Sequence, residues 1–199
     1  MVTHSSLHFY LDWAKARLDE MDATLASIES KAGEVKADAR AKADKILVDL
    51  RRERDAFRDK IAQQTADNES AWAAAKPKME GDWNAFEASV NQYVETLSKQ
   101  SQQQQAIFEQ QAAAQIKAWR EAGDKLTTDA KAFAADRRGD FDAAVVRMNA
   151  EAAAAQEKLH KLNHAGTQSW TALMAALSET RGVFDRASQA AREAFKRAA

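Results

Sequence analysis

The chain has 199 residues, with 29 basic and 30 acidic side chains and a formal net charge of −1. This near neutrality argues against a general nucleic-acid binder, which needs a basic face to release phosphate counterions. The chain has no cysteine, which excludes disulfides and thiolate metal sites, and no run of about 18 apolar residues that would span a bilayer. Six glycines and one proline among many Ala, Gln, Lys and Glu residues predict an all-α protein.

Apolar residues recur at alternating three- and four-residue steps through the first forty positions. This a/d pattern is too narrow to face a globular core, but it suits the groove of a partner helix. We therefore expect the chain to pair with itself, as a dimer, along a seam that includes Leu7, Leu11, Leu18, Met21, Leu25, Ile28 and Val35.

Residues 5–75 are predicted to form one helix about 105 Å long, at 1.5 Å per residue. Pro77 and Gly81 follow, and both disfavour a helix interior, so a reversal is expected between Ala75 and Trp83. A second long helix then covers residues 77–165. It includes the polar stretch at residues 99–105, because glutamine is a good helix former, and has kinks or caps at its Gly-Asp pairs.

A second turn is predicted at residues 163–167, before a final helix over residues 169–196. The expected fold is a long antiparallel coiled-coil hairpin with a shorter third helix, forming an elongated rod. Its segments are residues 1–76, 77–165 and 166–199.

The four histidines form two pairs with i,i+4 spacing, which places both imidazoles of a pair on one helix face. A hairpin would bring the two pairs to the same end, where they are candidates for a metal site at His4, His8, His160 and His164. The simpler interpretation is that these histidines are exposed near helix ends. No cofactor is expected.

The last helix separates aromatic from basic residues more clearly than any other segment. Between Arg181 and Ala199 there are five basic and two acidic residues, in a chain that is otherwise close to neutral. An aromatic face beside basic groups suits an anionic surface, whereas an apolar stripe usually packs into a core. Both interpretations remain open. The candidate surface-binding residues are Trp170, Arg181, Phe184, Arg186, Arg192, Phe195 and Lys196.

The Ala-, Gln-, Glu- and Lys-rich helices, the eleven-residue aromatic spacings (Trp72 to Trp83, Phe108 to Trp119) and the segment from Ser169 to Phe195 resemble apolipoprotein-type repeats and bacterial phasins, mainly over residues 108–199. The helix plan also resembles membrane-curving crescent dimers of the BAR type. The chain departs from these families in having one proline and no evident basic concave face. The resemblances imply binding to a lipid or granule surface.

The sequence thus predicts a non-enzymatic scaffold that self-assembles and coats or organises a membrane, lipid or hydrophobic granule. The alternative is a structural spacer or filament subunit that binds only protein. Residues 1–11 lack a basic segment followed by an apolar one, so a secretory signal is not expected. The predicted location is the cytoplasm, peripheral to a membrane or granule.

Overall fold

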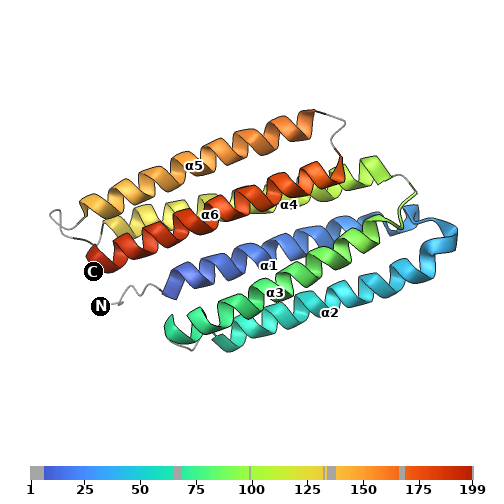
Figure 1. The fold of residues 1–199 in the computed structure, drawn as a ribbon, viewed down its shortest axis with the longest axis horizontal. Helices are drawn as coiled ribbons and strands as arrows, with labels where there is room; N and C mark the ends of the chain where they lie inside the picture. Colours follow the sequence, from blue (N-terminus) through green and yellow to red (C-terminus); the bar gives the residue numbers. More distant parts are fainter. Residues whose placement is uncertain are drawn as a thin grey trace. The chain divides into compact units, whose positions relative to one another are not determined.

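The computed structural model describes residues 7–64, 69–98, 100–131, 133, 138–165 and 169–198. Within these ranges the chain is helical and has no strand, which confirms the all-α class. The α-helices are α1 (Leu7–Ser30), α2 (Arg40–Gln64), α3 (Glu69–Val94), α4 (Gln100–Ala130), α5 (Gly139–His164) and α6 (Trp170–Ala198) (Figure 1).

The chain forms two compact units. Unit 1 contains Met1–Ala16 and Gln115–Ala199, and unit 2 contains Arg17–Ala114. The boundary falls inside helices α1 and α4. Each unit therefore combines one complete helix pair, α5–α6 or α2–α3, with parts of α1 and α4.

The prediction of one helix across residues 5–75 is wrong, because the chain reverses after Ser30. Two short 3₁₀ turns, Ala32–Glu34 and Ala37–Ala39, separate α1 from α2. Val35 between them is extended and forms an isolated antiparallel bridge with Leu97. Glycine at position 33 would lower the stability of a continuous helix by about 1 kcal/mol relative to alanine. The bridge to Leu97 offers the backbone around Val35 hydrogen-bond partners outside a helix.

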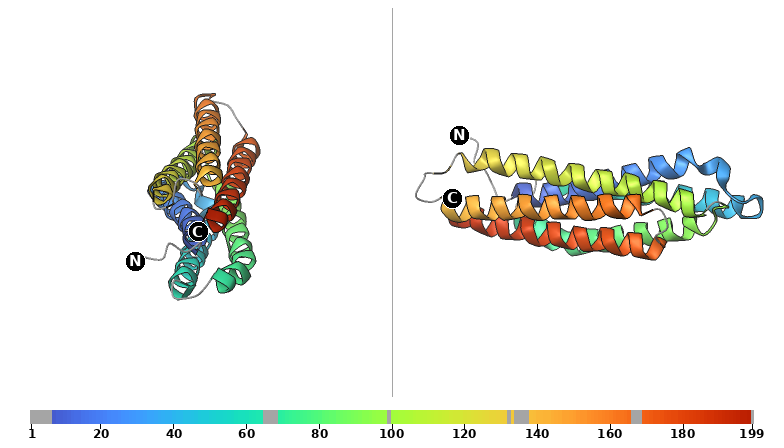
Figure 2. Two further views of the ribbon diagram at one scale, coloured as in Figure 1. Left: turned by 90° about the vertical axis from the view of Figure 1, so that its left-hand side faces the viewer. Right: turned by 90° about the horizontal axis from the view of Figure 1, so that it is seen from above.

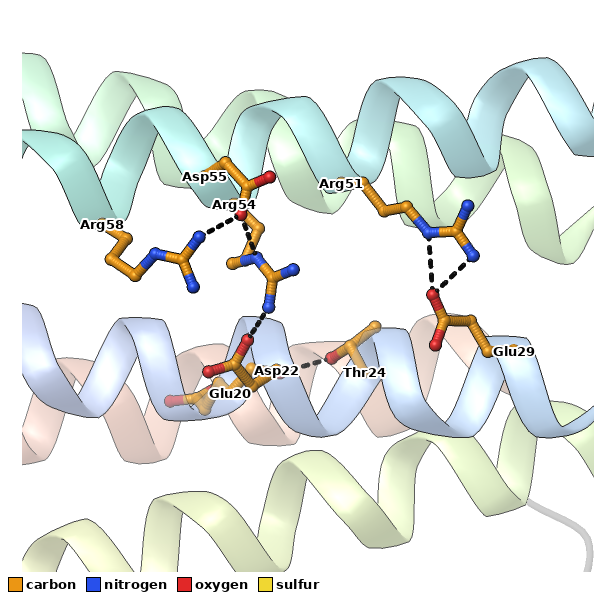
Figure 3. A network of polar contacts seen from close by, with 8 residues as sticks. All are labelled: Glu20, Asp22, Thr24, Glu29, Arg51, Arg54, Asp55 and Arg58. Atoms are coloured by element: carbon orange, nitrogen blue, oxygen red, sulfur yellow. Dashed lines mark hydrogen bonds and ion pairs between the residues drawn. The ribbon is translucent and has the colours of Figure 1, made fainter.

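Ion pairs between α1 and α2 show that the two helices run antiparallel in unit 2. Arg51 Nη2 lies 2.8 Å from Glu29 Oε1. Arg54, later than Arg51 on α2, pairs with Asp22, which is earlier than Glu29 on α1 (Figure 3). These pairs place α2 alongside α1 in unit 2, and the pairing of two copies of the chain along the a/d seam stays a prediction.

The predicted reversal between Ala75 and Trp83 is also wrong, since α3 continues through Pro77 and Gly81. Both residues are exposed, and the opposite face of α3 is buried. An interior proline costs about 3 kcal/mol relative to alanine. Burial of several large side chains, at about 1.5–3 kcal/mol each, outweighs that cost. These side chains are Trp72, Met79, Trp83, Phe86, Val90 and Tyr93.

Substitution of Gly81 tests this placement. No atom lies within 4 Å of the position that a Cβ would occupy at Gly81, so alanine fits without a clash. We expect Gly81→Ala to raise the free energy of unfolding by about 1 kcal/mol, because alanine is the better helix former. A urea titration measures this change. Destabilisation would instead mean that residue 81 lies in a turn that requires glycine.

The prediction of a second helix across residues 77–165 is wrong as well, because α3 ends at Val94, α4 spans Gln100–Ala130 and α5 begins only at Gly139. Other features of this later part agree with the sequence prediction. The glutamine-rich stretch is helical, as α4 begins at Gln100. Helices α5 and α6 run antiparallel side by side in all views (Figures 1 and 2), with Lys158 paired to Glu179 and Arg197 Nε 3.9 Å from Asp140 Oδ2. The predicted turn at residues 163–167 agrees with the end of α5 at His164, although residues 166–168 lie outside the described part.

A half-buried carboxylate in unit 2 gives a pH-dependent prediction. Ser89 Oγ donates a hydrogen bond of 3.2 Å to Glu53 Oε1, between α3 and α2. Burial, the largest effect, raises the pKa of the Glu53 carboxyl above its usual 4.5, although the bond from Ser89 opposes this. A raised carboxyl pKa means that the contribution of Glu53 to stability is fully present below pH 4.5 and is lost as pH rises through the folded pKa.

Glu53→Gln keeps an oxygen that accepts from Ser89 and removes the charge. We expect the variant to be more stable than the wild type at pH 7, with the difference shrinking as pH falls below 4.5. Thermal melts of both proteins at pH 7 and pH 4 measure this. A difference that is constant with pH would contradict the assignment.

Candidate surface-binding face of helix α6

Helix α6 is the candidate site because it has the strongest segregation of apolar and polar residues among the described helices. Its first turn is capped by Ser169, whose Oγ accepts a hydrogen bond of 3.3 Å from the Ala172 N–H. Lys196 and Arg197 lie in the last turn, where positive charge is favourable beside the helix carbonyls. Both ends of α6 are thus consistent with the local sequence.

The aromatic side chains of α6 lie in the core of unit 1. Phe184 meets Trp119 of α4 edge-on, with ring centroids 5.3 Å apart. Phe195 lies in a group of aromatic rings from other segments, at centroid distances of 5.2 to 6.0 Å. Its neighbours are His8, Phe9, Phe133 and Phe141. Both phenylalanines are at most 4% exposed, so the structure matches the core interpretation of this stripe.

The basic residues of α6 differ in their exposure. Arg186 and Lys196 are exposed, Arg192 is half-buried, and Trp170 at the start of the helix is half-buried. Arg181 is only 5% exposed and so does not lie on the polar face that the sequence predicted for it. Next to it, the buried Thr180 hydroxyl donates to Gln115 of α4. The exposed basic residues of α6 are therefore Arg186, Lys196 and Arg197, rather than all five.

Arg192 contacts α1, a contact that the sequence analysis missed. Its guanidinium lies over the Tyr10 ring, 4.8 Å from the centroid, and it donates to the Tyr10 hydroxyl. Arg192 Nη2 also lies 3.2 Å from Glu193 Oε1. Tyr10 and Arg192 are far apart in sequence and Tyr10 lies beside the a/d seam, so neither spacing nor periodicity indicated this pair.

The predicted seam residues are buried to different degrees. Met21, Leu25, Ile28 and Val35 are buried, whereas Leu7, Leu11 and Leu18 are half-buried. The residues beside the seam are also buried, including Trp13 and, in unit 2, Arg17, Glu20 and Thr24. The buried face of α1 is thus wider than an a/d seam, which occupies two positions in every seven.

The predicted histidine site is not assembled among the described residues. His160 and His164 stack with ring centroids 4.2 Å apart, and His164 Nδ1 lies 3.1 Å from the His160 carbonyl oxygen. His8 lies beside Asp129, with 3.6 Å between Nε2 and Oδ2. No group of three or more possible metal ligands occurs in the described ranges, and His4 lies outside them.

A shallow groove of about 310 Å³ lies between α4 and α5 in unit 1. Arg120 on α4 donates a hydrogen bond of 3.0 Å to Gln156 on α5 at this groove. A Cβ at Gly123 would lie 2.4 Å from Asn149 Oδ1, so glycine permits the close approach of these helices.

Comparisons with protein families, curated proteins and solved structures find no match to this chain. In the part of the chain that the structure describes, no helix is both long enough and apolar enough to cross a membrane.

Proposed function

We propose that this protein is a non-enzymatic scaffold that binds and coats an anionic lipid surface through helix α6. The observation that carries the proposal is the amphipathic character of α6, with Phe184 and Phe195 on one face and Arg186 and Lys196 exposed on the other. Helices of this kind lie in the interface of a membrane, with aromatic residues in the acyl boundary and basic residues at the headgroups.

Binding requires the apolar face of α6 to leave the core of unit 1. The face would then exchange a protein environment for a lipid environment rather than for water, so the hydrophobic cost of leaving the core is largely recovered. We further propose that the protein acts in the cytoplasm and self-associates into a dimer on the surface. Coating a surface with a small helical protein is favoured when neighbouring copies also contact each other.

Charge reversal on the exposed face of α6 tests the proposal without changing the core. The variant carries Arg186→Glu and Lys196→Glu. Each basic residue near an anionic surface contributes about 1 kcal/mol, so loss of two should weaken binding to phosphatidylserine vesicles by about 30-fold or more. Vesicle flotation at low salt measures the affinity.

A matched control carries Arg147→Glu and Lys161→Glu on the exposed face of α5. Both variants change the net charge equally. The lysine replaced in each variant, Lys161 or Lys196, also lies near a glutamate on its own helix. We expect the α5 variant to lose much less affinity. Equal losses would mean that net charge, not α6, drives binding. If the wild type does not float with the vesicles, the proposal fails and a spacer or filament subunit that binds only protein takes its place.

A further inference from the structure

The first turns of α1 cover residues of α6 that are proposed to bind lipid. We call residues 7–16 of α1 the strap; they belong to unit 1. Tyr10 of the strap lies against Arg192, and Phe9 lies edge-on to Phe195 with ring centroids 6.0 Å apart. His8 meets the same phenylalanine at 5.3 Å. Phe195 and Arg192 of the candidate surface-binding face thus already contact the strap.

Three polar contacts join the strap to α4, about one helical turn apart along the strap. His8 lies beside Asp129, Lys125 Nζ lies 3.2 Å from Asp12 Oδ1, and Lys15 Nζ lies 2.6 Å from Glu121 Oε2. The register is antiparallel and regular.

The Lys15 pair is the most exposed of the three, with side chains 57% and 45% exposed. The hydrogen bond from Lys15 lowers the pKa of the Glu121 carboxyl below its usual value. Exposed pairs contribute little to stability, so the strap depends mainly on Phe9, Tyr10 and Trp13, which are buried.

The strap is also the smallest helical part of unit 1. It contributes ten residues, whereas α5 and α6 contribute 26 and 29. The strap is the N-terminal end of α1, which continues to Ser30, and helix ends open at lower free energy than helix interiors. Release of the strap therefore costs fewer contacts than separation of α5 from α6.

We infer that the strap is an autoinhibitory segment, which must leave Arg192 and Phe195 before α6 binds an anionic lipid surface. This inference rests on the proposed function. The physical reason is mutual exclusion: the Arg192 guanidinium cannot lie over Tyr10 and bind a lipid phosphate at once, and the edge of Phe195 cannot face both Phe9 and acyl chains. Anionic headgroups compete with Tyr10 for Arg192, so an anionic surface itself favours release.

Two charge swaps on α4 test the inference. Glu121→Lys with Lys125→Asp places like charges opposite Lys15 and Asp12, and the net charge of the protein is unchanged. We expect amide hydrogen exchange in the strap to rise by about tenfold or more and vesicle affinity to rise with it. Adding Asp12→Lys and Lys15→Glu restores opposite charges and should return both measurements to the wild-type values.

A cross-link provides the opposite test and does not depend on weakening the fold. Because the native chain has no cysteine, Lys15→Cys with Glu121→Cys can be joined by a cleavable bis-maleimide that holds the strap on α4. We expect the linked protein not to float with phosphatidylserine vesicles and to regain flotation after cleavage. A matched link between Glu157→Cys and Lys161→Cys, within α5, should have no effect.

The outcomes separate the two proposals. If the swapped variant shows faster exchange in the strap but unchanged vesicle affinity, or if the linked protein binds as well as the cleaved one, the strap is not inhibitory. If exchange in the strap rises and no variant binds vesicles, the proposed function itself is overturned.

Discussion

Leu25→Asp is expected to unfold unit 2, whereas the same substitution at Leu18 should cost far less. Leu25 is 4% exposed in the core of unit 2, but Leu18, one heptad earlier on the same seam, is half-buried. An unpaired carboxylate buried at position 25 costs several kcal/mol, which is a large part of the 5–15 kcal/mol that typically stabilises a domain. At position 18 the carboxylate can remain hydrated, so a cost of about 1 kcal/mol is expected.

Circular dichroism during a thermal melt, together with light scattering for molar mass, distinguishes the two variants. We expect loss of helix for Leu25→Asp and a small decrease in melting temperature for Leu18→Asp. Leu25→Ala provides a second measure, with an expected loss of about 2–5 kcal/mol. Equal effects at both positions, with a change in molar mass, would instead support the seam as a contact between two copies of the chain.

Glu20→Ala should destabilise unit 2 by about 3–5 kcal/mol, because it removes the carboxylate from a buried ion pair. Arg17 Nη1 lies 2.9 Å from Glu20 Oε1, and the two side chains are 4% and 0% exposed. The Arg17 guanidinium also lies 5.6 Å from the centre of the Trp83 ring on α3. Figure 3 shows Glu20 on α1, where its backbone carbonyl accepts a hydrogen bond from the Thr24 hydroxyl.

A variant that removes both charges, Arg17→Met with Glu20→Leu, should recover most of the lost stability. Apolar residues of similar volume often replace a buried ion pair at little cost. Urea titrations of the wild type, Glu20→Ala and the double variant measure the free energies. If Glu20→Ala and the double variant are equally destabilised, the loss comes from packing around position 20 rather than from the broken ion pair.

The all-α class was predictable because helix propensity is high nearly everywhere along the chain. The helical state of the glutamine-rich stretch followed from propensity alone, as did α6, whose start after Ser169 matches its cap. The apolar face of α6 was also identified correctly as far as its aromatic residues are concerned, since Phe184 and Phe195 are buried. Each of these features depends on local sequence.

The positions of the reversals were not predictable from local sequence. Gly33 and Gly81 both have low helix propensity, yet the chain turns near Gly33 and remains helical at Gly81. The turn is supported by the bridge between Val35 and Leu97, 62 positions apart. A contact at that separation leaves no signal in the residues around Gly33, and Pro77 wrongly suggested the later site.

The buried polar residues of unit 2 were missed for a related reason. Thr24 Oγ1 accepts a hydrogen bond of 2.9 Å from Gln111 Nε2 of α4, and both side chains are fully buried. Polar residues beside an apolar seam are usually placed on the solvated face, so the sequence predicted a narrow seam. Gln111 of α4 is 87 positions from Thr24 of α1, so only the folded structure shows that the two side chains are partners.

Depth-dependent fluorescence on α6 tests the central claim most directly. An environment-sensitive fluorophore is attached to Trp170→Cys, on the apolar face, and in a second protein to Gln189→Cys, which is exposed. The vesicles contain phosphatidylserine and a phosphatidylcholine with brominated acyl chains, which quench fluorophores that enter the acyl region. If α6 binds lipid through its apolar face, the probe at 170 is quenched and the probe at 189 is not. Equal quenching at both positions, or none at either, would contradict the account.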